Sequence, residues 1–196
     1  NKYSMLRPSA MLCAAALVPL HHVRMSVEVL QPSLATANAA GITFEVKAFD
    51  ELSVHQLYAV LALRQQIFVL EQECLFPDID NADQDCLHLL AYDATKLIGY
   101  TRMGDVGTSY TDALTIGRVL VSESHRGLGL FNPLMRRSIK AVRKRYGQEL
   151  PVTIGAQAHL QALYRRLGFT AMSDEYLEDG IPHVDMTLSG DMMSVV

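Results

Sequence analysis

A strand followed by a two-glycine turn and the start of a helix is the segment of this sequence best suited to hold a ligand. It reads VLVSESHRGLGLFNPLMRRSI, with Arg126 beside Gly127 and Gly129. Glycine lets the main chain approach a ligand closely, and a helix N-terminus offers free N–H groups and the positive end of the helix dipole. The turn therefore suits a pyrophosphate. A tight strand-to-helix connection with a solvated arginine has the same pattern, so this segment alone leaves both interpretations open.

A second segment further along the chain, AQAHLQALYRRLGF, carries a tyrosine on the expected inner face of a helix. Gln157, Leu160 and Tyr164 share that face. A tyrosine so placed most often packs in the core, but its hydroxyl needs a partner when it is buried. Tyr164 is therefore either a packing residue or a group that serves a site, and the two segments together are more specific than either one alone.

An arginine within an expected strand points to a carboxylate partner. Arg118 stands in the middle of that strand, so its side chain must meet a polar cleft or a carboxylate. Asp78 and Asp80, in an acid-rich loop, are the expected partners, and Arg64 and Arg102 are further arginines in predicted elements. Such a group either lines a polar acceptor pocket or forms a structural ion pair, and we favour the ion pair.

Hydrophobic periodicity supplies the elements that must position these residues. Ser53 and Gln56 have the spacing of a capping box at the start of the first helix. Gly147 is placed to end the second helix, and Gly117 marks a bulge or a close backbone approach within its strand. The mixed order of elements predicts an α/β (mixed α+β) fold, with a mostly antiparallel sheet and helices on both faces. The expected strands are 42–48, 87–92, 97–103, 114–121, 151–156, 169–172 and 183–188, and the expected helices are 54–70, 131–146 and 158–167.

The composition limits the classes of function. The chain has 196 residues, 49% of them apolar, and a formal net charge of −4, which argues against a nucleic-acid partner. No apolar run is long enough to cross a bilayer, so no membrane span is expected. Three cysteines give no disulfide framework. Cys74, Cys86 and His88 lack the spacing of a zinc finger, so no metal is expected.

The composition of the first forty residues is typical of an extension rather than of a folded domain. An apolar run at 10–20 follows Lys2 and Arg7, and the only acid in this stretch is Glu28. This pattern favours an organellar targeting segment, with the mitochondrial matrix preferred and the cytoplasm as the alternative. A disordered tail, or a segment that docks on a larger complex, fits the same residues. We therefore expect an extension at 1–41, a domain at 42–188 and a tail at 189–196.

Four segments taken together resemble the GNAT acetyltransferase superfamily, most closely its ElaA-like branch. The resemblance covers nearly the whole expected domain. It implies the GNAT acyl-CoA N-acyltransferase fold, with acetyl-CoA as cofactor, CoA as product, and a small amine or a protein amino group as acceptor. The segments are RQQIFVLEQECLFPDID at 64–80, IGRVLVSESHRG at 116–127, GAQAHLQALYRRLGF at 155–169 and EDGIPH at 178–183.

The resemblance also implies roles for particular residues. Two neighbouring parallel strands, 114–121 and 151–156, would separate to admit the pantetheine arm, and a main-chain N–H there would polarise the thioester carbonyl. Tyr164 would protonate the departing thiolate. The residues implied in cofactor binding are Val119, Leu120 and Val121 for the arm, Arg126, Gly127, Leu128, Gly129 and Leu130 for the pyrophosphate, and Gln157.

Direct attack by an amine requires a base, because an ammonium group is not a nucleophile. Glu71 is the first candidate, since it follows the first helix and opens a loop where the resemblance places the acceptor wall. His183 is the second, because the pKa of free histidine lies near neutrality. Each has a structural alternative: a solvated surface carboxylate for Glu71, and a structural histidine at the start of a strand for His183. The remaining candidates are Asp80, His159 and Glu178.

Phe131 departs from the pattern of the superfamily, which has glycine or alanine at this position. Either its ring points into the core and the turn can still hold a pyrophosphate, or it narrows the phosphate site. Two functions follow. The first is an N-acetyltransferase that moves an acetyl group from acetyl-CoA to an amine. The second is a weakened acetyltransferase fold that serves as an interaction or assembly subunit of a larger complex.

Overall fold

One mixed sheet organises the part of the chain that the computed structural model describes, residues 41–75 and 77–190. The described residues all belong to one unit, Thr36–Val196. The predicted extension, apart from Gly41, lies outside the described residues, and so does most of the predicted tail. The targeting and docking interpretations of the extension therefore remain predictions.

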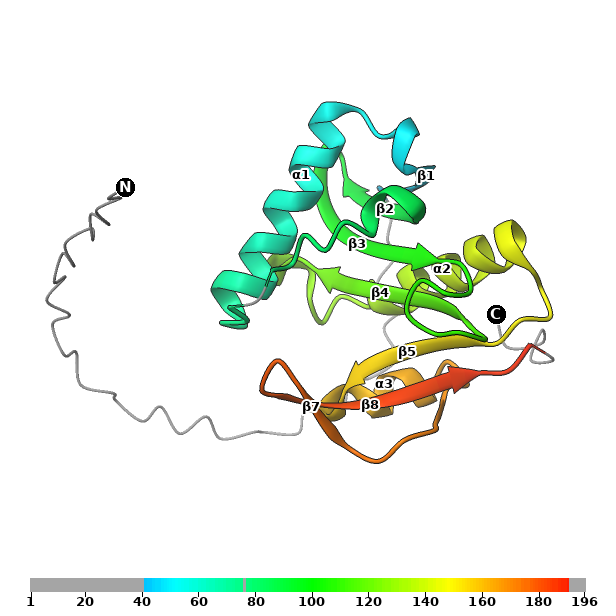
Figure 1. The fold of residues 1–196 in the computed structure, drawn as a ribbon. Helices are drawn as coiled ribbons and strands as arrows, with labels where there is room; N and C mark the ends of the chain where they lie inside the picture. The colour runs from blue at the N-terminus through cyan, green and yellow to red at the C-terminus, as the bar shows by residue number, and fades with distance from the viewer. Residues whose placement is uncertain (1–40, 76, 191–196) are drawn as a thin grey trace, which may run out of the picture. The chain divides into compact units, whose positions relative to one another are not determined.

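Eight strands form this sheet in the order β1-β2-β3-β4-β5-β8-β6, and β7 also pairs with β8 (Figure 1). Neighbouring strands are antiparallel, apart from β4 and β5, which are parallel. This confirms the predicted fold class. The strands are β1 Ile42–Ala48, β2 Leu87–Asp93, β3 Lys96–Gly104, β4 Leu114–Val121, β5 Val152–Gln157, β6 Thr170–Ala171, β7 Tyr176–Glu178 and β8 Ile181–Leu188.

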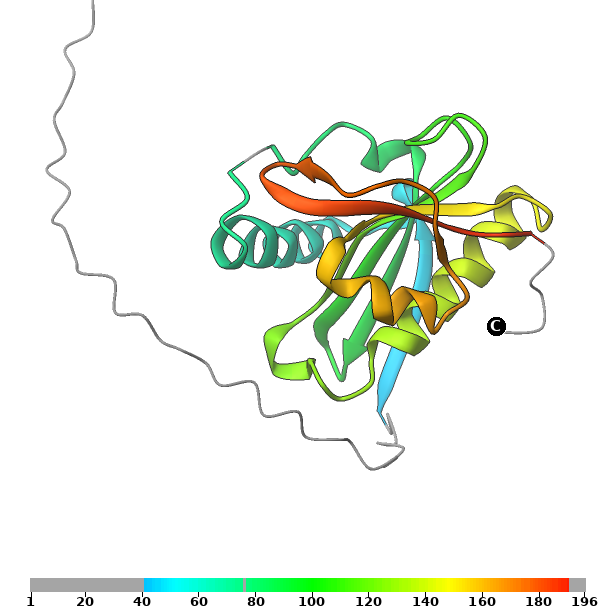
Figure 2. The same ribbon diagram turned by 90° about the horizontal axis from the view of Figure 1, so that it is seen from below.

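Helices cover both faces of the sheet, α1 on one side and α2 and α3 on the other (Figure 2). Ser53 caps α1 as predicted, since its Oγ accepts the Gln56 N–H at 3.1 Å and the Gln56 side chain accepts the Ser53 N–H at 3.1 Å. The bounds are α1 Val54–Arg64, α2 Phe131–Tyr146 and α3 Gln161–Arg165, with a π-helical turn at Gln65–Glu71 and 3₁₀ turns at Phe49–Glu51, Asp83–Asp85, Glu123–His125 and Ala158–Leu160.

Two apolar clusters fill the space between the helices and the sheet. The larger one lies beneath α2 and α3, and the smaller one lies beneath α1. Since both faces of the sheet are covered, Leu89 and Leu90 are fully buried although they point to opposite faces of β2. Each such side chain contributes about 1.5–3 kcal/mol on burial. Strand β4 also contributes to the smaller cluster, through Leu120.

Two of the differences from the sequence prediction lie close to the candidate site. The first helix was expected to run to Leu70, but it changes after Arg64 into a π-helical turn, in which the Gln72 N–H donates to the Ile67 carbonyl. Strand β7 was not predicted. It exists because Asp179 and Gly180, with φ of +52° and +79°, form a turn that folds β7 back on β8.

Candidate functional site

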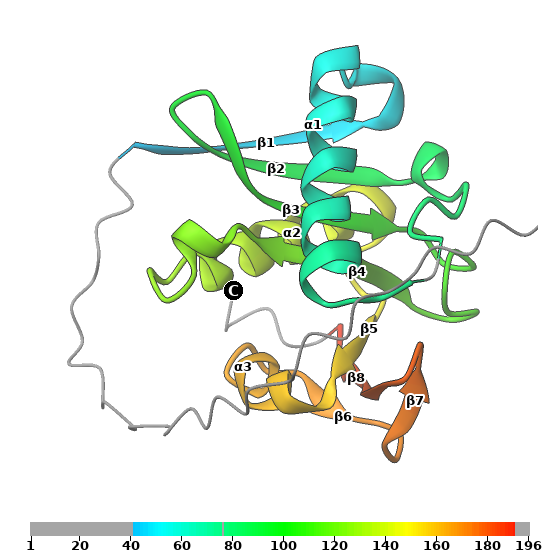
Figure 3. The same cartoon turned by 90° about the vertical axis from the view of Figure 1, so that its left-hand side faces the viewer.

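The parallel strands β4 and β5 separate soon after they begin. They pair only at Leu114 with Val152 and at Thr115 with Thr153. Figure 1 shows the two strands together at one end and apart at the other, and Figure 3 shows β5 continuing beside β8 on the far side of the opening. The separation predicted for these strands is therefore present, and it leaves main-chain edges that no strand of the described residues occupies.

A β-bulge shapes the β4 side of the opening. Arg102 pairs with Gly117 and Tyr100 with Leu120, so Arg118 and Val119 share the place opposite Thr101. Arg118 adopts a left-handed φ of +51°. A bulge leaves an extra residue unpaired and redirects the chain. The bulge anticipated at Gly117 is thus present, and it turns this stretch of main chain toward the opening.

A cleft of about 730 Å³ occupies the opening. Its walls come from the loop after α1, from β4 and β5, from α3, and from the hairpin of β7 and β8. Of the predicted site residues, Val119, Gln157, Tyr164 and His183 line it, and so does Glu178, one of the remaining candidates for the base. Other lining residues that matter below are Asp78, Tyr110, Arg118, Gly155, Tyr176 and Asp185.

The two-glycine turn lies between β4 and α2. Gly127 and Gly129 have φ of +75° and +81°, conformations that favour glycine, and among the described residues no atom beyond the chain neighbours lies within 4 Å of where a Cβ would stand on either. The N-cap of α2 is Leu130, and the first N–H groups of a helix have no acceptor within that helix. The turn therefore offers open main-chain donors at a helix N-terminus, as a pyrophosphate site requires.

Glu71 does not take the place that the sequence suggested for it. Its carboxylate is ion-paired with Arg126, whose Nη2 donates to Oε2 at 2.9 Å while Nη1 donates to Oε1. Glu71 is not among the residues that line the cleft. The hydrogen bond from Arg126 lowers the pKa of Glu71, which makes it a poorer proton acceptor. Glu71 as the base therefore stays a prediction, and its pairing with Arg126, which the position after α1 could not reveal, weighs against it.

The other predicted residues of the turn and of β4 divide between core and surface. Leu120 and Leu130 are buried, so only their main-chain groups can face a ligand, whereas the Leu128 side chain is 57% exposed. The Val121 carbonyl accepts a hydrogen bond from Arg126 Nε at 3.0 Å. Arg126 thus connects the end of β4 with Glu71 across the turn.

Tyr164 is buried in the wall of the cleft, with a residue exposure of 6%. Its ring meets those of Phe131 and Phe169 edge-on, at centroid distances of 5.3 and 6.0 Å. Its hydroxyl has no hydrogen-bond partner among the described residues, and burial raises its pKa to about 12. Tyr164 therefore keeps its proton at neutral pH and presents it to the cleft.

Phe131 packs against the large core cluster and does not line the cleft. Of the two orientations left open by the sequence, the structure has the one in which the ring points inward. The phosphate turn is therefore not narrowed by this side chain. The ring instead supports Tyr164, which the sequence pattern gave no reason to expect.

Gln157 and His183 face each other across β5 and β8, where they pair in register. Gln157 Nε2 donates to Gln72 Oε1 at 3.2 Å. The nitrogen His183 Nδ1 lies 2.8 Å from the Ile181 carbonyl, an acceptor, so Nδ1 carries the proton of the neutral ring. His183 Nε2 is then unprotonated, so His183 has the geometry of a proton acceptor.

The predicted ion pair of Arg118 is part of a larger network. Arg118 Nε donates to Asp78 Oδ1 at 2.7 Å, and fully buried Arg64 donates to Asp78 Oδ2 at 2.7 Å. Arg64 and Arg102 also share Asp83, a buried partner that the sequence prediction missed. The structural interpretation of these arginines is confirmed, although Arg118 and Asp78 also line the cleft.

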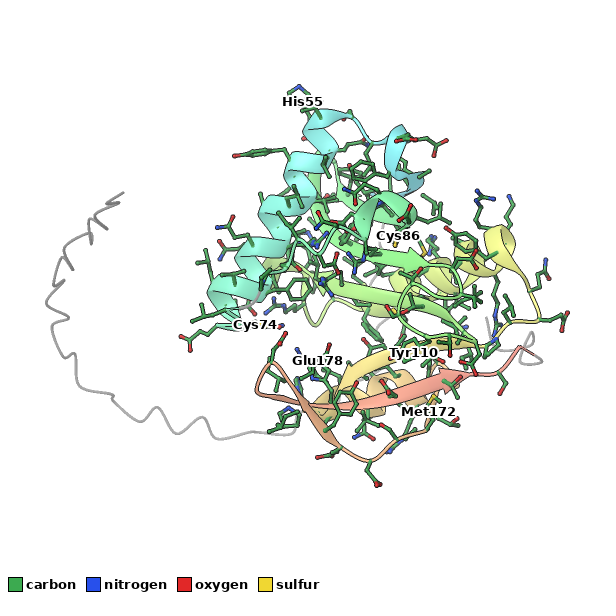
Figure 4. All side chains as sticks on the ribbon, viewed as in Figure 1. His55, Cys74, Cys86, Tyr110, Met172 and Glu178 are labelled. Atoms are coloured by element: carbon green, nitrogen blue, oxygen red, sulfur yellow. The ribbon has the colours of Figure 1, made fainter. Side chains whose placement is uncertain are left out.

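A polar group at the end of the cleft where β4 and β5 pair was also missed. Tyr110 and Tyr176 both donate to Asp185 Oδ1, at 2.7 and 2.9 Å. Figure 4 labels Tyr110 and Glu178, which lie toward β5 and β8. Two signals could have revealed this group: the Asp-Gly pair that closes the β7–β8 hairpin, and the polar alternation of His183 and Asp185 on an otherwise apolar strand.

The described residues contain neither a cluster suited to a metal ion nor a membrane-spanning helix. In residues 41–75 and 77–190 no cluster of three histidine, cysteine, aspartate or glutamate side chains could hold a metal ion. No helix in the same ranges is long and apolar enough to span a membrane.

Comparison with known proteins gives a family and a fold. The family model described as acetyltransferase (GNAT) domain matches residues 54–189. Protein ElaA of Escherichia coli is 41% identical over 139 residues, which cover 70% of this chain and 90% of that protein. A UPF0039 protein of Schizosaccharomyces pombe is 36% identical over 150 residues, covering 76% and 98%. The crystal structure of an acyl-CoA N-acyltransferase from Pseudomonas aeruginosa superposes with a TM-score of 0.70 at 39% identity, covering 74% and 98%.

Proposed function

Because the chain belongs to the GNAT acetyltransferase family and to its ElaA-like branch, we propose that it transfers an acetyl group from acetyl-CoA to an amine by direct attack. The observation that carries the proposal is the separation of β4 from β5 beside an open helix N-terminus. A thioester arm needs free main-chain edges to pair with, and a pyrophosphate needs free N–H groups. Both are present in this chain, a few residues apart.

The residues present fit acetyl-CoA. Gly127 and Gly129 leave the turn bare, and Arg126 adds a positive charge beside it. The unpaired main chain at Val119 borders the cleft, where one of its N–H groups would polarise a thioester carbonyl. When bound, acetyl-CoA supplies an acyl group that an amine can attack. Glu71 would release Arg126 to the pyrophosphate, since an exposed ion pair is worth less than about 1 kcal/mol.

Tyr164 holds the proton that the departing thiolate requires. The raised pKa keeps the hydroxyl protonated, and the absence of another partner among the described residues leaves it free for the sulfur. General acid catalysis of this kind contributes about 10²–10⁴-fold to a rate.

His183 would take the proton from the incoming ammonium, directly or through water. The hydrogen bond between Nδ1 and the Ile181 carbonyl fixes the tautomer, so Nε2 is the accepting atom. The ring stacks on Tyr176 at a centroid distance of 6.2 Å, which limits its rotation. His183 therefore replaces Glu71 as the favoured base.

Calorimetry with acetyl-CoA tests the proposal first, followed by a thiol-release assay over a panel of primary amines. We expect saturable binding and amine-dependent release of CoA. Arg126→Ala should weaken binding about tenfold or more, whereas Arg145→Ala, an exposed arginine at the other end of α2, should leave it unchanged. A protein that gives no heat with millimolar acetyl-CoA would overturn the proposal.

A further inference from the structure

Oxygen atoms of three side chains converge over Gly155 at the end of the cleft where β4 and β5 pair. A Cβ on Gly155 would stand 3.4 Å from Tyr176 Oη, 3.6 Å from Glu178 Oε2 and 3.7 Å from Tyr110 Oη. Gly155 is two residues beyond the last parallel pair, and Asp185 is directly opposite it on β8. Its backbone does not require glycine, since φ is not left-handed. The absence of a side chain at Gly155 therefore leaves room in the cleft, as glycine in a strand does where a ligand approaches.

Among the described residues, the carboxylates of Asp185 and Glu178 have no cationic partner. Asp185 accepts two tyrosine hydroxyls on Oδ1 alone. Burial, aided by the Asp185 carboxylate, raises the pKa of Tyr110 and of Tyr176, so both hydroxyls keep their protons. In residues 41–75 and 77–190 no arginine, lysine or histidine forms an ion pair with Asp185 or with Glu178. Two negative charges thus face the cleft uncompensated.

Tyr164 gives independent support for a ligand in the same cleft. Its side chain is more than nine-tenths buried, and its hydroxyl, which borders the cleft, has no partner among the described residues. The hydroxyl is the part of this side chain that reaches the cleft, so it is free to donate a hydrogen bond to a ligand there. The cleft therefore has one wall suited to the leaving thiolate and another suited to a cation.

We propose that the acidic pocket formed by Asp185, Glu178, Tyr110 and Tyr176 over Gly155 binds a second positive charge on the acceptor. The preferred acceptors are then diamines, polyamines or chains that carry a further ammonium or guanidinium group. The reason is electrostatic. The attacking amine must be neutral when it reacts, so it cannot balance two carboxylates at that moment. A second cationic group on the same molecule can.

This inference rests on the proposed function, but its central test does not require turnover. Calorimetry would compare 1,4-diaminobutane with butylamine, both on the free protein and on the protein saturated with CoA. We expect the diamine to bind at least tenfold more tightly, because a hydrogen bond to a charged group is worth a factor of about ten or more. Equal affinity for the two amines would overturn the inference, even where CoA binding and acetyl transfer are seen.

Three variants locate the effect. Asp185→Asn and Glu178→Gln keep the shape and remove one charge each, so each should cut the preference for the diamine about tenfold or more. Gly155→Ala adds a methyl group that makes only ordinary contacts, so the fold should survive while diamine affinity falls. Glu175→Gln, an exposed acid outside the cleft lining, is the matched control.

The acetyl-CoA affinity of each variant separates this inference from the proposed function. It should match that of the unaltered protein, because the acidic pocket lies away from the phosphate turn. An Asp185→Asn variant that kept the full preference for the diamine would refute the pocket. A protein that bound diamines selectively but gave no heat with acetyl-CoA would refute the proposed function and leave the pocket standing.

Discussion

Replacing Tyr164 by phenylalanine separates the chemistry of the site from the packing around it. The substitution keeps the ring, whose centroid lies 5.3 Å from that of Phe131 and 6.0 Å from that of Phe169, and removes only the hydroxyl. That hydroxyl has no hydrogen-bond partner among the described residues, although the residue is 6% exposed. We therefore expect turnover to fall while stability changes little.

The size of both changes follows from the surroundings of the hydroxyl. The hydroxyl is not a fully buried atom, because it borders the cleft and water reaches it. Its removal should therefore change the free energy of unfolding by no more than about 0.5 kcal/mol. For a protein of this length that shifts Tm by about 2 °C or less. Turnover should fall by about 10²–10⁴-fold, the usual contribution of a general acid.

Differential scanning calorimetry and thiol release measure the two quantities on one preparation. Acetyl-CoA affinity should not change, so the loss belongs to kcat. The control variant Tyr146→Phe lies at the C-terminal end of α2 and outside the cleft lining, so it should change neither turnover nor affinity. A Tyr164→Phe protein with unaltered kcat would remove Tyr164 from the proton-donor role. A fall in Tm of several degrees would show that the hydroxyl stabilises the fold and that its surroundings have been misread.

Three further predictions concern the charged groups. Asp83→Ala should lower the free energy of unfolding by about 3–5 kcal/mol, since it leaves two buried guanidinium groups short of a partner, and urea titration measures this. The hydrogen bond from Arg102 lowers the pKa of Asp80, so the stability that this pair contributes should be full above about pH 4 and decline as the pH falls further. Thermal melts from pH 7 to pH 2 should therefore show a larger fall in Tm for the unaltered protein than for Asp80→Asn, and equal falls would contradict the prediction. Glu71→Gln should tighten acetyl-CoA binding by up to about fivefold by freeing Arg126, and calorimetry that shows weaker binding would give the carboxylate a direct role in the site.

Local pattern was sufficient where a single element decides the structure. The capping box of Ser53 and Gln56, the C-cap at Gly147 and the bulge near Gly117 depend on residues a few positions apart, and all three are present. The pairing of Arg118 with Asp78 was also predictable, because a cation within a strand must find an anion.

Pairing between distant elements was not predictable from local pattern. Glu71 and Arg126 are far apart in sequence, and only the folded chain brings the end of the first helical segment to the turn before α2. The acidic pocket was missed in the sequence prediction for the same reason, since Tyr110, Tyr176 and Asp185 come from three different segments. Sequence spacing places side chains on a face of an element, but the register between elements decides which faces meet.

The ion network around Arg64 connects the stability of the fold to the shape of the cleft. Arg118 is held in a left-handed conformation, which costs a residue with a side chain about 1–2 kcal/mol. Its guanidinium is fixed by Asp78, and Asp78 is fixed in turn by Arg64, the fully buried last residue of α1. The bulge that turns the main chain of Val119 toward the cleft therefore depends on a salt bridge anchored in the core. A weakened network should disturb the proposed acetyl transfer before it unfolds the domain, because the strained residue is the part of the network nearest to the site.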